Sequence, residues 1–98
     1  MGYTIVWTKQ AEKGYSKIIR YLIENWTEKE LQRFLEETRT FLNLVEDNPM
    51  LLKMSASHKH LHRGPLNRLT IVTYRIRPHL KRIELVNIRG ARQKPAKK

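Results

Sequence analysis

The sequence contains no cysteine, only four glycines and four prolines, and no long apolar run. Without cysteine, the chain has no disulfide, thiolate nucleophile or cysteine-ligated metal. No stretch approaches the roughly 20 apolar residues that a membrane-spanning helix needs. The 98 residues, of which 40% are hydrophobic and 30% charged, are enough for one globular domain with one core. We therefore expect a single-domain cytoplasmic protein.

Acidic residues are nearly absent from the second half of the chain. Residues 1–47 carry seven Lys or Arg and eight Asp or Glu, whereas residues 48–98 carry thirteen Lys or Arg and a single acid, Glu84. So much charge of one sign repels itself unless it faces an anion. The split therefore favours a nucleic acid or an acidic protein as the partner. The alternative is a lysine-rich solvated surface, in which more acids should be mixed with the cations.

A short strand and two amphipathic helices account for the first half. Residues 3–7 contain the β-branched and aromatic side chains of a strand, and Thr8 can cap a following helix. Apolar residues recur at spacings of three and four over 11–26 and again over 31–45, which predicts two helices packed on a core. Pro49 ends the second helix. Because the helices follow each other without a linker, they should form an antiparallel hairpin.

Strand patterns fill the second half. Residues 58–63 alternate as in a strand, and the sequence Gly-Pro-Leu-Asn at 64–67 is typical of a turn. Residues 68–77 contain the strongest strand pattern in the chain. Within it, Tyr74 alternates with Val72 and Ile76 and is expected in the core, whereas Arg75 and Arg77 share the opposite face. Pro78-His79 predicts another tight turn, and residues 81–88 predict a returning strand.

These elements together predict an α+β fold. A strand is followed by a two-helix hairpin and then by an antiparallel meander of about three strands, with the helices on one face of the sheet. The segment 50–54 fits either a short strand or a loop. We expect residues 1–92 to form the domain and residues 93–98 to form a basic tail.

Three of the four histidines are spaced by two, at positions 58, 60 and 62. In a strand, this spacing places all three on one face. Three imidazoles can hold zinc, but the segment contains no carboxylate to orient them, so we expect no metal and no cofactor. Acid–base chemistry or phosphate contact is the stronger functional hypothesis, because imidazole titrates near neutral pH. The alternative is that these histidines are simply solvated.

The arginines form a second group of candidates. The planar guanidinium matches phosphate, and a metal-free site that cleaves RNA needs such charge around the phosphorane. Any single arginine could equally be an isolated surface charge. If the protein is a ribonuclease, its catalytic candidates are His60, His62, Arg63, Arg75 and Arg92. Candidate contacts to an anionic partner are Lys53, Lys59, Arg68, Arg77, Arg82 and Arg89. Paired carboxylates and Gly-rich phosphate loops are missing from this half, which argues against glycosidase, two-metal and dinucleotide chemistry.

Several short segments occur in an order that is typical of one family. They are Ile5-Val6-Trp7-Thr8 with Ala11, Tyr21 and Trp26, Phe41 to Val45 with Pro49, Ile71-Val72-Thr73-Tyr74-Arg75-Ile76, Ile83-Glu84-Leu85-Val86-Asn87-Ile88, and Arg92-Gln93-Lys94-Pro95. From Tyr3 to Pro95 the chain resembles the RelE/ParE superfamily of bacterial type II toxins, sometimes labelled plasmid stabilisation proteins. The resemblance implies a toxin that inhibits growth unless a cognate acidic antitoxin covers it. It also implies that operator DNA is bound only through the antitoxin.

The resemblance leaves the target open, because the superfamily divides into two branches. RelE-type toxins cleave mRNA on the ribosome without metal, whereas ParE-type toxins poison DNA gyrase. In this sequence, Ile71 stands where the cleaving branch has a basic residue, three positions before the shared Tyr74. The tail also lacks that branch's tyrosine. In this resemblance, Arg92 occupies the position of the family's arginine after the last strand. His60 and His62 occupy roughly the positions of the family's lysines.

We therefore expect a toxin that inhibits gyrase, because the long helical hairpin is similar to that of the gyrase-directed branch. The alternative is a RelE-like ribosome-dependent endoribonuclease. A small RNA-binding accessory protein ranks lower, since the strands lack the interleaved aromatic residues of common RNA-binding sheets.

Overall fold

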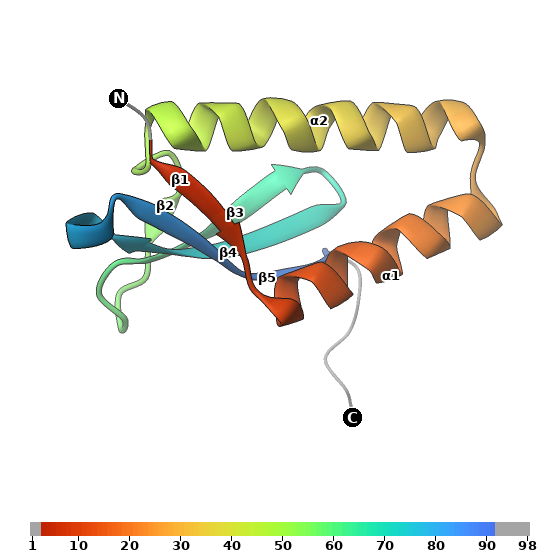
Figure 1. The fold of residues 1–98 in the computed structure, drawn as a ribbon. Coiled ribbons are helices and arrows are strands. Elements are labelled where there is room, and N and C mark those ends of the chain that lie inside the picture. Colours follow the sequence, from red (N-terminus) through yellow and green to blue (C-terminus); the bar gives the residue numbers. More distant parts are fainter. Residues whose placement is uncertain (1–2, 92–98) are drawn as a thin grey trace.

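A computed structural model gives the fold and describes residues 3–91. Two helices form a hairpin that packs on a twisted sheet (Figure 1), so the predicted α+β class is confirmed. The elements in chain order are β1 (Thr4–Trp7), α1 (Lys9–Asn25), α2 (Glu28–Asp47), β2 (Lys53–Met54), β3 (Leu61–Asn67), β4 (Thr70–Arg77), the 3₁₀-helix η1 (Pro78–Leu80) and β5 (Arg82–Gly90). Within the described residues, neither α-helix is long and apolar enough to cross a membrane.

The sheet has five strands in the order β1-β5-β4-β3-β2. The antiparallel meander of β3, β4 and β5 is confirmed, and β2 extends it by a short antiparallel pairing. The segment 50–54, which fitted a strand or a loop, therefore contributes two residues to the sheet edge. In contrast, β1 runs parallel to β5, so the sheet is mixed. A parallel pair needs a long connection, and the hairpin together with the meander provides it.

Alternation along β4 separates the two faces of the sheet. Val72, Tyr74 and Ile76 are buried, whereas the residues between them are partly exposed. The buried face contributes to a core that also contains Phe41 and Val45 of α2. The opposite face of β4 has no fully buried residue, so it is available to bind a partner.

Helix α1 is fixed to β5 by its first residues. The Thr8 Oγ1 accepts a hydrogen bond from the Ala11 amide at 3.2 Å, which confirms the predicted cap, and donates one to the Leu85 carbonyl at 2.7 Å. One turn later, Gly14 lies directly against the Ile88 carbonyl, and any Cβ at this position would overlap it. A glycine is therefore required for the close approach of helix and strand. From sequence alone, Gly14 is only a weak helix former.

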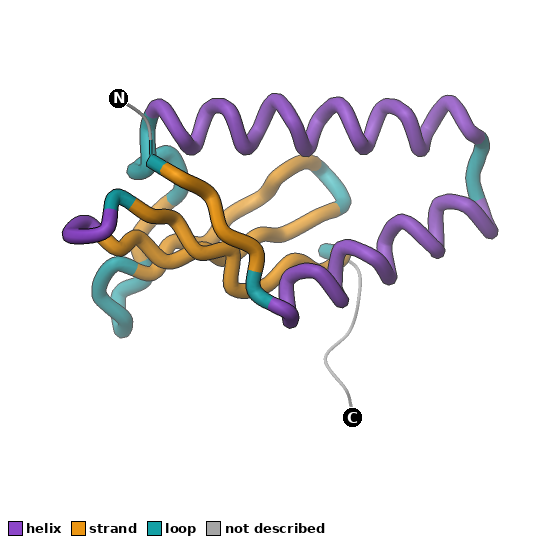
Figure 2. The backbone as a smooth tube through the Cα atoms, viewed as in Figure 1, coloured by secondary structure: helices purple, strands orange, loops and turns teal. Residues whose placement is uncertain are grey.

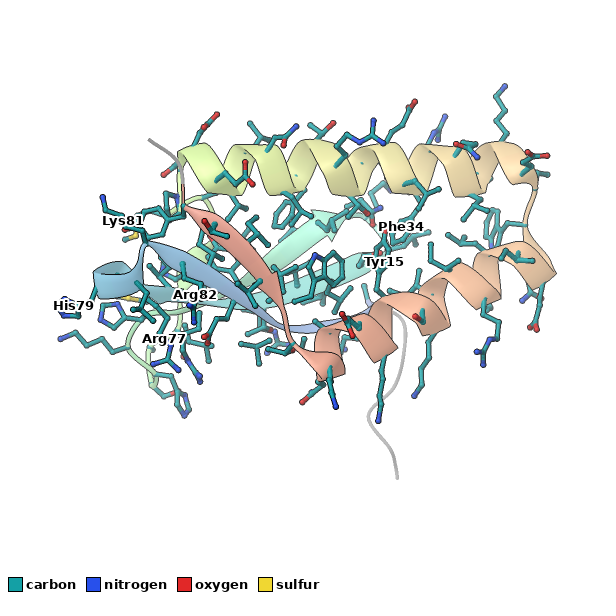
Figure 3. The ribbon with its side chains drawn as sticks, viewed as in Figure 1. Tyr15, Phe34, Arg77, His79, Lys81 and Arg82 are labelled. Carbon is teal, nitrogen blue, oxygen red and sulfur yellow. The ribbon has the colours of Figure 1, made fainter. Side chains whose placement is uncertain are left out.

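The distal end of the hairpin lies beyond the sheet, as Figure 2 shows. Between the helices, the Tyr15 and Phe34 rings stack with centroids 5.3 Å apart, and both point into this space in Figure 3. Farther out, Ile23 is 62% exposed and Trp26, which is already past the end of α1, is 48% exposed. The expectation that the apolar stripe packs on a core along its whole length is wrong at this end, because the sheet does not extend under it.

The predicted strand over 58–63 is wrong at its start. The strand β3 begins only at Leu61, because His60 has a positive φ of 67° that interrupts extended backbone. Before it, the Ser55 Oγ accepts hydrogen bonds from the Ser57 and His58 amides and closes a local turn.

The predicted turn at 64–67 is also wrong, since these residues belong to β3. A shift of register between Pro65 and Asn67 accommodates the proline within the strand. The chain turns at residues 68–69 instead. There the Asn67 side chain accepts a hydrogen bond from the Leu69 amide at 2.9 Å, which forms an Asx turn.

Candidate macromolecule-binding face

The strand register places most of the candidate cations on the face that lacks buried residues. Lys53 pairs with Arg63 across β2 and β3, and Arg77 pairs with Arg82 across β4 and β5. Residues directly paired across strands point to the same side of a sheet. By the same rule, this face carries Arg75, which alternates with Tyr74, and the half-buried Arg89, which pairs with Ile71. We call Lys53, Arg63, Arg75, Arg77, Arg82 and Arg89 the open-face cations.

A single carboxylate lies among these cations. Glu84 approaches Arg77 at 3.3 Å (Nε to Oε1) and Arg82 at 3.9 Å (NH1 to Oε2). Both pairs are partly exposed, and such pairs typically contribute about 0–1 kcal/mol. Within residues 3–91, the other four open-face cations form no ion pair. Six cations against one carboxylate leave this face strongly positive.

The remaining predicted contacts lie elsewhere. Arg68 is exposed in the turn between β3 and β4, away from the centre of the open face. Lys59 lies in the loop before β3 and borders a hollow on the other side of the sheet edge. Arg92 falls outside the described residues.

The structure separates the histidines from the arginines. His62 is only 1% exposed and belongs to the buried face, where its ring stacks on that of Tyr74 with centroids 5.3 Å apart. Its Nδ1 lies 2.7 Å from the Leu52 carbonyl oxygen. Because a carbonyl can only accept, Nδ1 must carry the hydrogen. His62 is therefore held in one tautomer as part of the core.

The expectation that His58, His60 and His62 share one strand face is wrong, because the first two precede β3. His60 lies in a left-handed backbone position, and its carbonyl accepts a hydrogen bond from the Ile76 amide at 2.9 Å. The His58 Nδ1 contacts the Ser57 hydroxyl at 3.0 Å. Among residues 3–91, no three His, Asp or Glu side chains form a group suited to a metal ion.

Tyr74 is a core residue, as its alternation with Val72 and Ile76 predicted, and it also fixes the connection after α2. Its hydroxyl donates to the Pro49 carbonyl at 2.6 Å and accepts from the Leu52 amide at 3.3 Å. Burial raises the pKa of Tyr74 above its usual 10.0, and the hydrogen bond with Leu52 offsets part of that rise. Together with His62, this hydroxyl holds residues 49–52 against the sheet. Sequence reasoning missed this role, because its partners lie more than 20 residues away.

Comparison with known proteins identifies the family. The family model described as the ParE toxin of the type II toxin–antitoxin system parDE matches residues 5–95. No sequence among curated proteins matches this chain.

Solved structures share the fold at low sequence identity. The RelBE2 toxin–antitoxin complex of Mycobacterium tuberculosis includes a chain with 12% identity and a TM-score of 0.63, with 92% of this chain and 99% of that chain covered. A mutant of the Escherichia coli toxin RelE in the free state has 12% identity and a TM-score of 0.64, with 94% and 86% covered. The archaeal RelE–RelB complex of Pyrococcus horikoshii has 20% identity and a TM-score of 0.60, with 96% and 100% covered. With this fold and a family match over almost its whole length, the chain belongs to the ParE toxin family of type II toxin–antitoxin systems, within the RelE/ParE superfamily.

Proposed function

We propose that this toxin inhibits growth by binding DNA gyrase rather than by cleaving RNA. The observation that carries the proposal is the separation of histidines from arginines. A general acid or base must lie within hydrogen-bond reach of the reacting group. The His62 ring points into the core and already donates to Leu52, whereas Arg63 and Arg75 lie on the opposite face. The predicted histidine–arginine ribonuclease site therefore lacks one of its two proton-transfer groups.

Two surfaces remain for binding a large target. The open-face cations suit a complex that holds DNA, as gyrase does, because cations attract phosphates without any need for catalytic groups. The distal end of the hairpin adds apolar residues, with Tyr21 57% exposed and Ile23 62% exposed. Aromatic and apolar anchors of this kind commonly dominate binding between proteins.

An antitoxin is the natural regulator of these surfaces. The structures from M. tuberculosis and P. horikoshii are both toxin–antitoxin complexes. We propose that this chain has a cognate acidic antitoxin, which neutralises the open-face cations and through which the toxin reaches operator DNA. The toxin, its antitoxin and gyrase would then meet in the cytoplasm.

The proposal is tested by adding purified toxin to gyrase with relaxed plasmid and, separately, to ribosomes translating an mRNA. We expect supercoiling to stop and the mRNA to stay intact. The double variant Arg63→Glu/Arg75→Glu should lose most of the inhibition. The matched double variant Lys13→Glu/Arg39→Glu makes the same charge change on exposed helix positions away from the distal end of the hairpin and should retain inhibition.

A RelE-like ribonuclease is the second candidate. It is favoured by one observation, that Arg63 and Arg75 lie on neighbouring strands of one face without an ion pair in residues 3–91. Translation-dependent cleavage of mRNA by the purified chain, with supercoiling unaffected, would establish this candidate and refute the gyrase proposal. In that case His60→Ala should reduce cleavage, since His60 is the partly exposed histidine nearest β3.

A further inference from the structure

A hollow beside η1 gathers four side chains of kinds that bind metal ions. It lies at the end of the core, on the face of the sheet opposite the open-face cations, and its volume is about 430 Å³. The four side chains are the thioethers of Met50 and Met54 and the imidazoles of His60 and His62. The rest of the lining is apolar apart from Lys59. The hollow is larger than a single ion, so flexible side chains must close around any ion held there.

Three separate segments bring these four side chains together. Met54 of β2 pairs directly with His62 of β3, and such partners point to the same side of a sheet with Cβ atoms about 4.5–5.5 Å apart. The ring of His60 also lines the hollow, because a left-handed φ of 67° turns the chain just before β3. Met50 comes from the connection after α2, where its amide donates to the Asn48 Oδ1 at 3.3 Å. This grouping therefore depends on the tertiary structure.

The buried ring of His62 is oriented as the rings of metal-binding histidines are. Such histidines almost always donate their second ring N–H to a carbonyl or carboxylate, which fixes the tautomer and the plane of the ring. Here the Nδ1 donates to the Leu52 carbonyl at 2.7 Å, and the ring stacks on Tyr74. The neutral ring then has its free electron pair on Nε2.

The Nε2 of His62 is unpartnered and faces the hollow. His62 is only 1% exposed, and its Nε2 has no hydrogen-bond partner in residues 3–91. A buried polar atom without a partner is unusual. Because none of the sealed side-chain nitrogens in this part of the chain lacks a partner, Nε2 must be accessible, and the hollow is what His62 lines. The ring of His60 likewise makes no hydrogen bond within the described residues.

The two thioethers are free to move toward an ion. Met50 is 63% exposed and Met54 is 46% exposed, although methionine is commonly a buried residue. Three rotatable bonds and a polarisable sulfur allow a methionine side chain to adapt to its surroundings. Both sulfur atoms can therefore turn into the hollow without any change in the core.

The chemistry of these ligands favours Cu(I). Soft thioether sulfur selects this ion, and imidazole binds it as well. Zinc prefers thiolates, several imidazoles or carboxylates, whereas the chain has no cysteine and residues 48–83 contain no acid. The third histidine of the loop, His58, is not part of the lining and contacts Ser57 instead. All four ligands are neutral, and Lys59 repels a divalent ion more strongly than a monovalent one.

We propose that this hollow, called the Met–His pocket below, binds one Cu(I) ion through the sulfur atoms of Met50 and Met54 and the ring nitrogens of His60 and His62. The bound ion would join the connection after α2 and the strand β2 to the start of β3. Because the unfolded chain does not hold these ligands together, the ion should stabilise the folded state. The proposal does not depend on the proposed function, since it invokes neither gyrase nor an antitoxin.

The test measures Cu(I) binding to the full chain under argon, with ascorbate as the reductant and bicinchoninate as a coloured competing chelator. We expect the chain to withdraw one Cu(I) ion from the chelator and its Tm to rise with the Cu(I) concentration. Ag(I), a soft ion of the same charge, should raise the Tm as well, whereas Zn(II) should not. A chain that withdraws no Cu(I), or that binds Zn(II) as tightly as Cu(I), would overturn the proposal.

Variants locate the ion. Met54→Leu removes the sulfur atom and keeps an apolar side chain of similar volume, and His60→Gln removes an imidazole that is only half-buried. Each should lower the affinity for Cu(I) about tenfold or more, since loss of an outer-shell partner alone typically costs about 10–100-fold. The matched control is His79→Gln, because His79 is exposed on η1 (Figure 3) and does not line the hollow. It should bind Cu(I) like the unsubstituted chain.

Equal affinities of His60→Gln and His79→Gln, or of Met54→Leu and the unsubstituted chain, would refute the Met–His pocket. Circular dichroism verifies that each variant is folded, and the core residue His62 is left unchanged for this reason. X-ray absorption of the Cu(I)-loaded chain should show both sulfur and nitrogen neighbours, and nitrogen alone would contradict the assignment. Because gyrase inhibition is measured without copper, a toxin that inhibits gyrase but binds no Cu(I) refutes only this inference.

Discussion

Replacing Tyr74 by Phe removes one hydroxyl and leaves the ring in the core. The hydroxyl makes two hydrogen bonds, one to the Pro49 carbonyl at 2.6 Å and one from the Leu52 amide at 3.3 Å. Each such bond contributes about 1 kcal/mol net, and both partners lie in a partly buried region where they are costly to leave unpaired. We therefore expect Tyr74→Phe to lower the free energy of unfolding by about 2 kcal/mol. For a domain of this size, that corresponds to a fall in Tm of about 8–16 °C.

The measurement is chemical and thermal unfolding followed by circular dichroism, with Tyr21→Phe as the matched control. Tyr21 is 57% exposed, and its hydroxyl makes no hydrogen bond within the described residues, so its loss should cost less than about 0.5 kcal/mol. Hydrogen exchange gives a local readout, because the Leu52 amide should exchange faster in Tyr74→Phe. Equal stability of the two variants would refute the reasoning, and unchanged exchange at Leu52 would show that the hydroxyl does not hold this loop.

Two further predictions concern backbone contact and titration. Gly14→Ala should destabilise the fold severely or prevent folding, because the added Cβ meets a backbone carbonyl of β5. Gly64→Ala should cost much less, because its Cβ meets only the Leu52 side chain, which can move aside. Comparable unfolding midpoints for the two variants would contradict this prediction. Burial raises the pKa values of Tyr15 and Tyr74 in the folded chain. Stability should therefore be insensitive to these groups below about pH 10 and fall as pH rises above it, since the unfolded state loses the protons first. The free energy of unfolding of Tyr74→Phe, measured by urea unfolding at each pH, should fall less steeply above pH 10 than that of the unsubstituted chain. An identical slope would exclude Tyr74 as a cause of the fall.

The sequence predicted the elements whose signals are local. Thr8 precedes a run of helical periodicity and does cap α1, and the alternation around Tyr74 did identify the buried face of β4. The errors occurred where a tertiary contact overrode a local pattern. Gly64 and Pro65 are typical turn residues, yet pairing with β4 draws them into a strand. Trp26 continues an apolar stripe, but no part of the sheet extends far enough to cover it.

The candidate site was predicted only in part for the same reason. Spacing along a single strand correctly placed Arg75 and Arg77 on one face, because a strand's two-residue period is a local property. The role of His62 could not be predicted from spacing along one strand, because its ring contacts Leu52 and Tyr74. Sheet pairing brings Tyr74 beside it, and the loop after α2 brings Leu52 beside it.

By itself, the sequence determined the chemical character of this chain: a composition without cysteine, an acid-poor second half, and the periodicities that make helices and strands. These properties depend on composition and on neighbours along the chain. The tertiary structure alone decided which cations share a surface, which histidine is buried and where an apolar hollow remains. Each of these depends on strand order and register, and a register shift of one residue exchanges the two faces of a strand. Long-range packing, rather than local preference, therefore places the open-face cations on one face of the sheet and the hydrophobic core on the other.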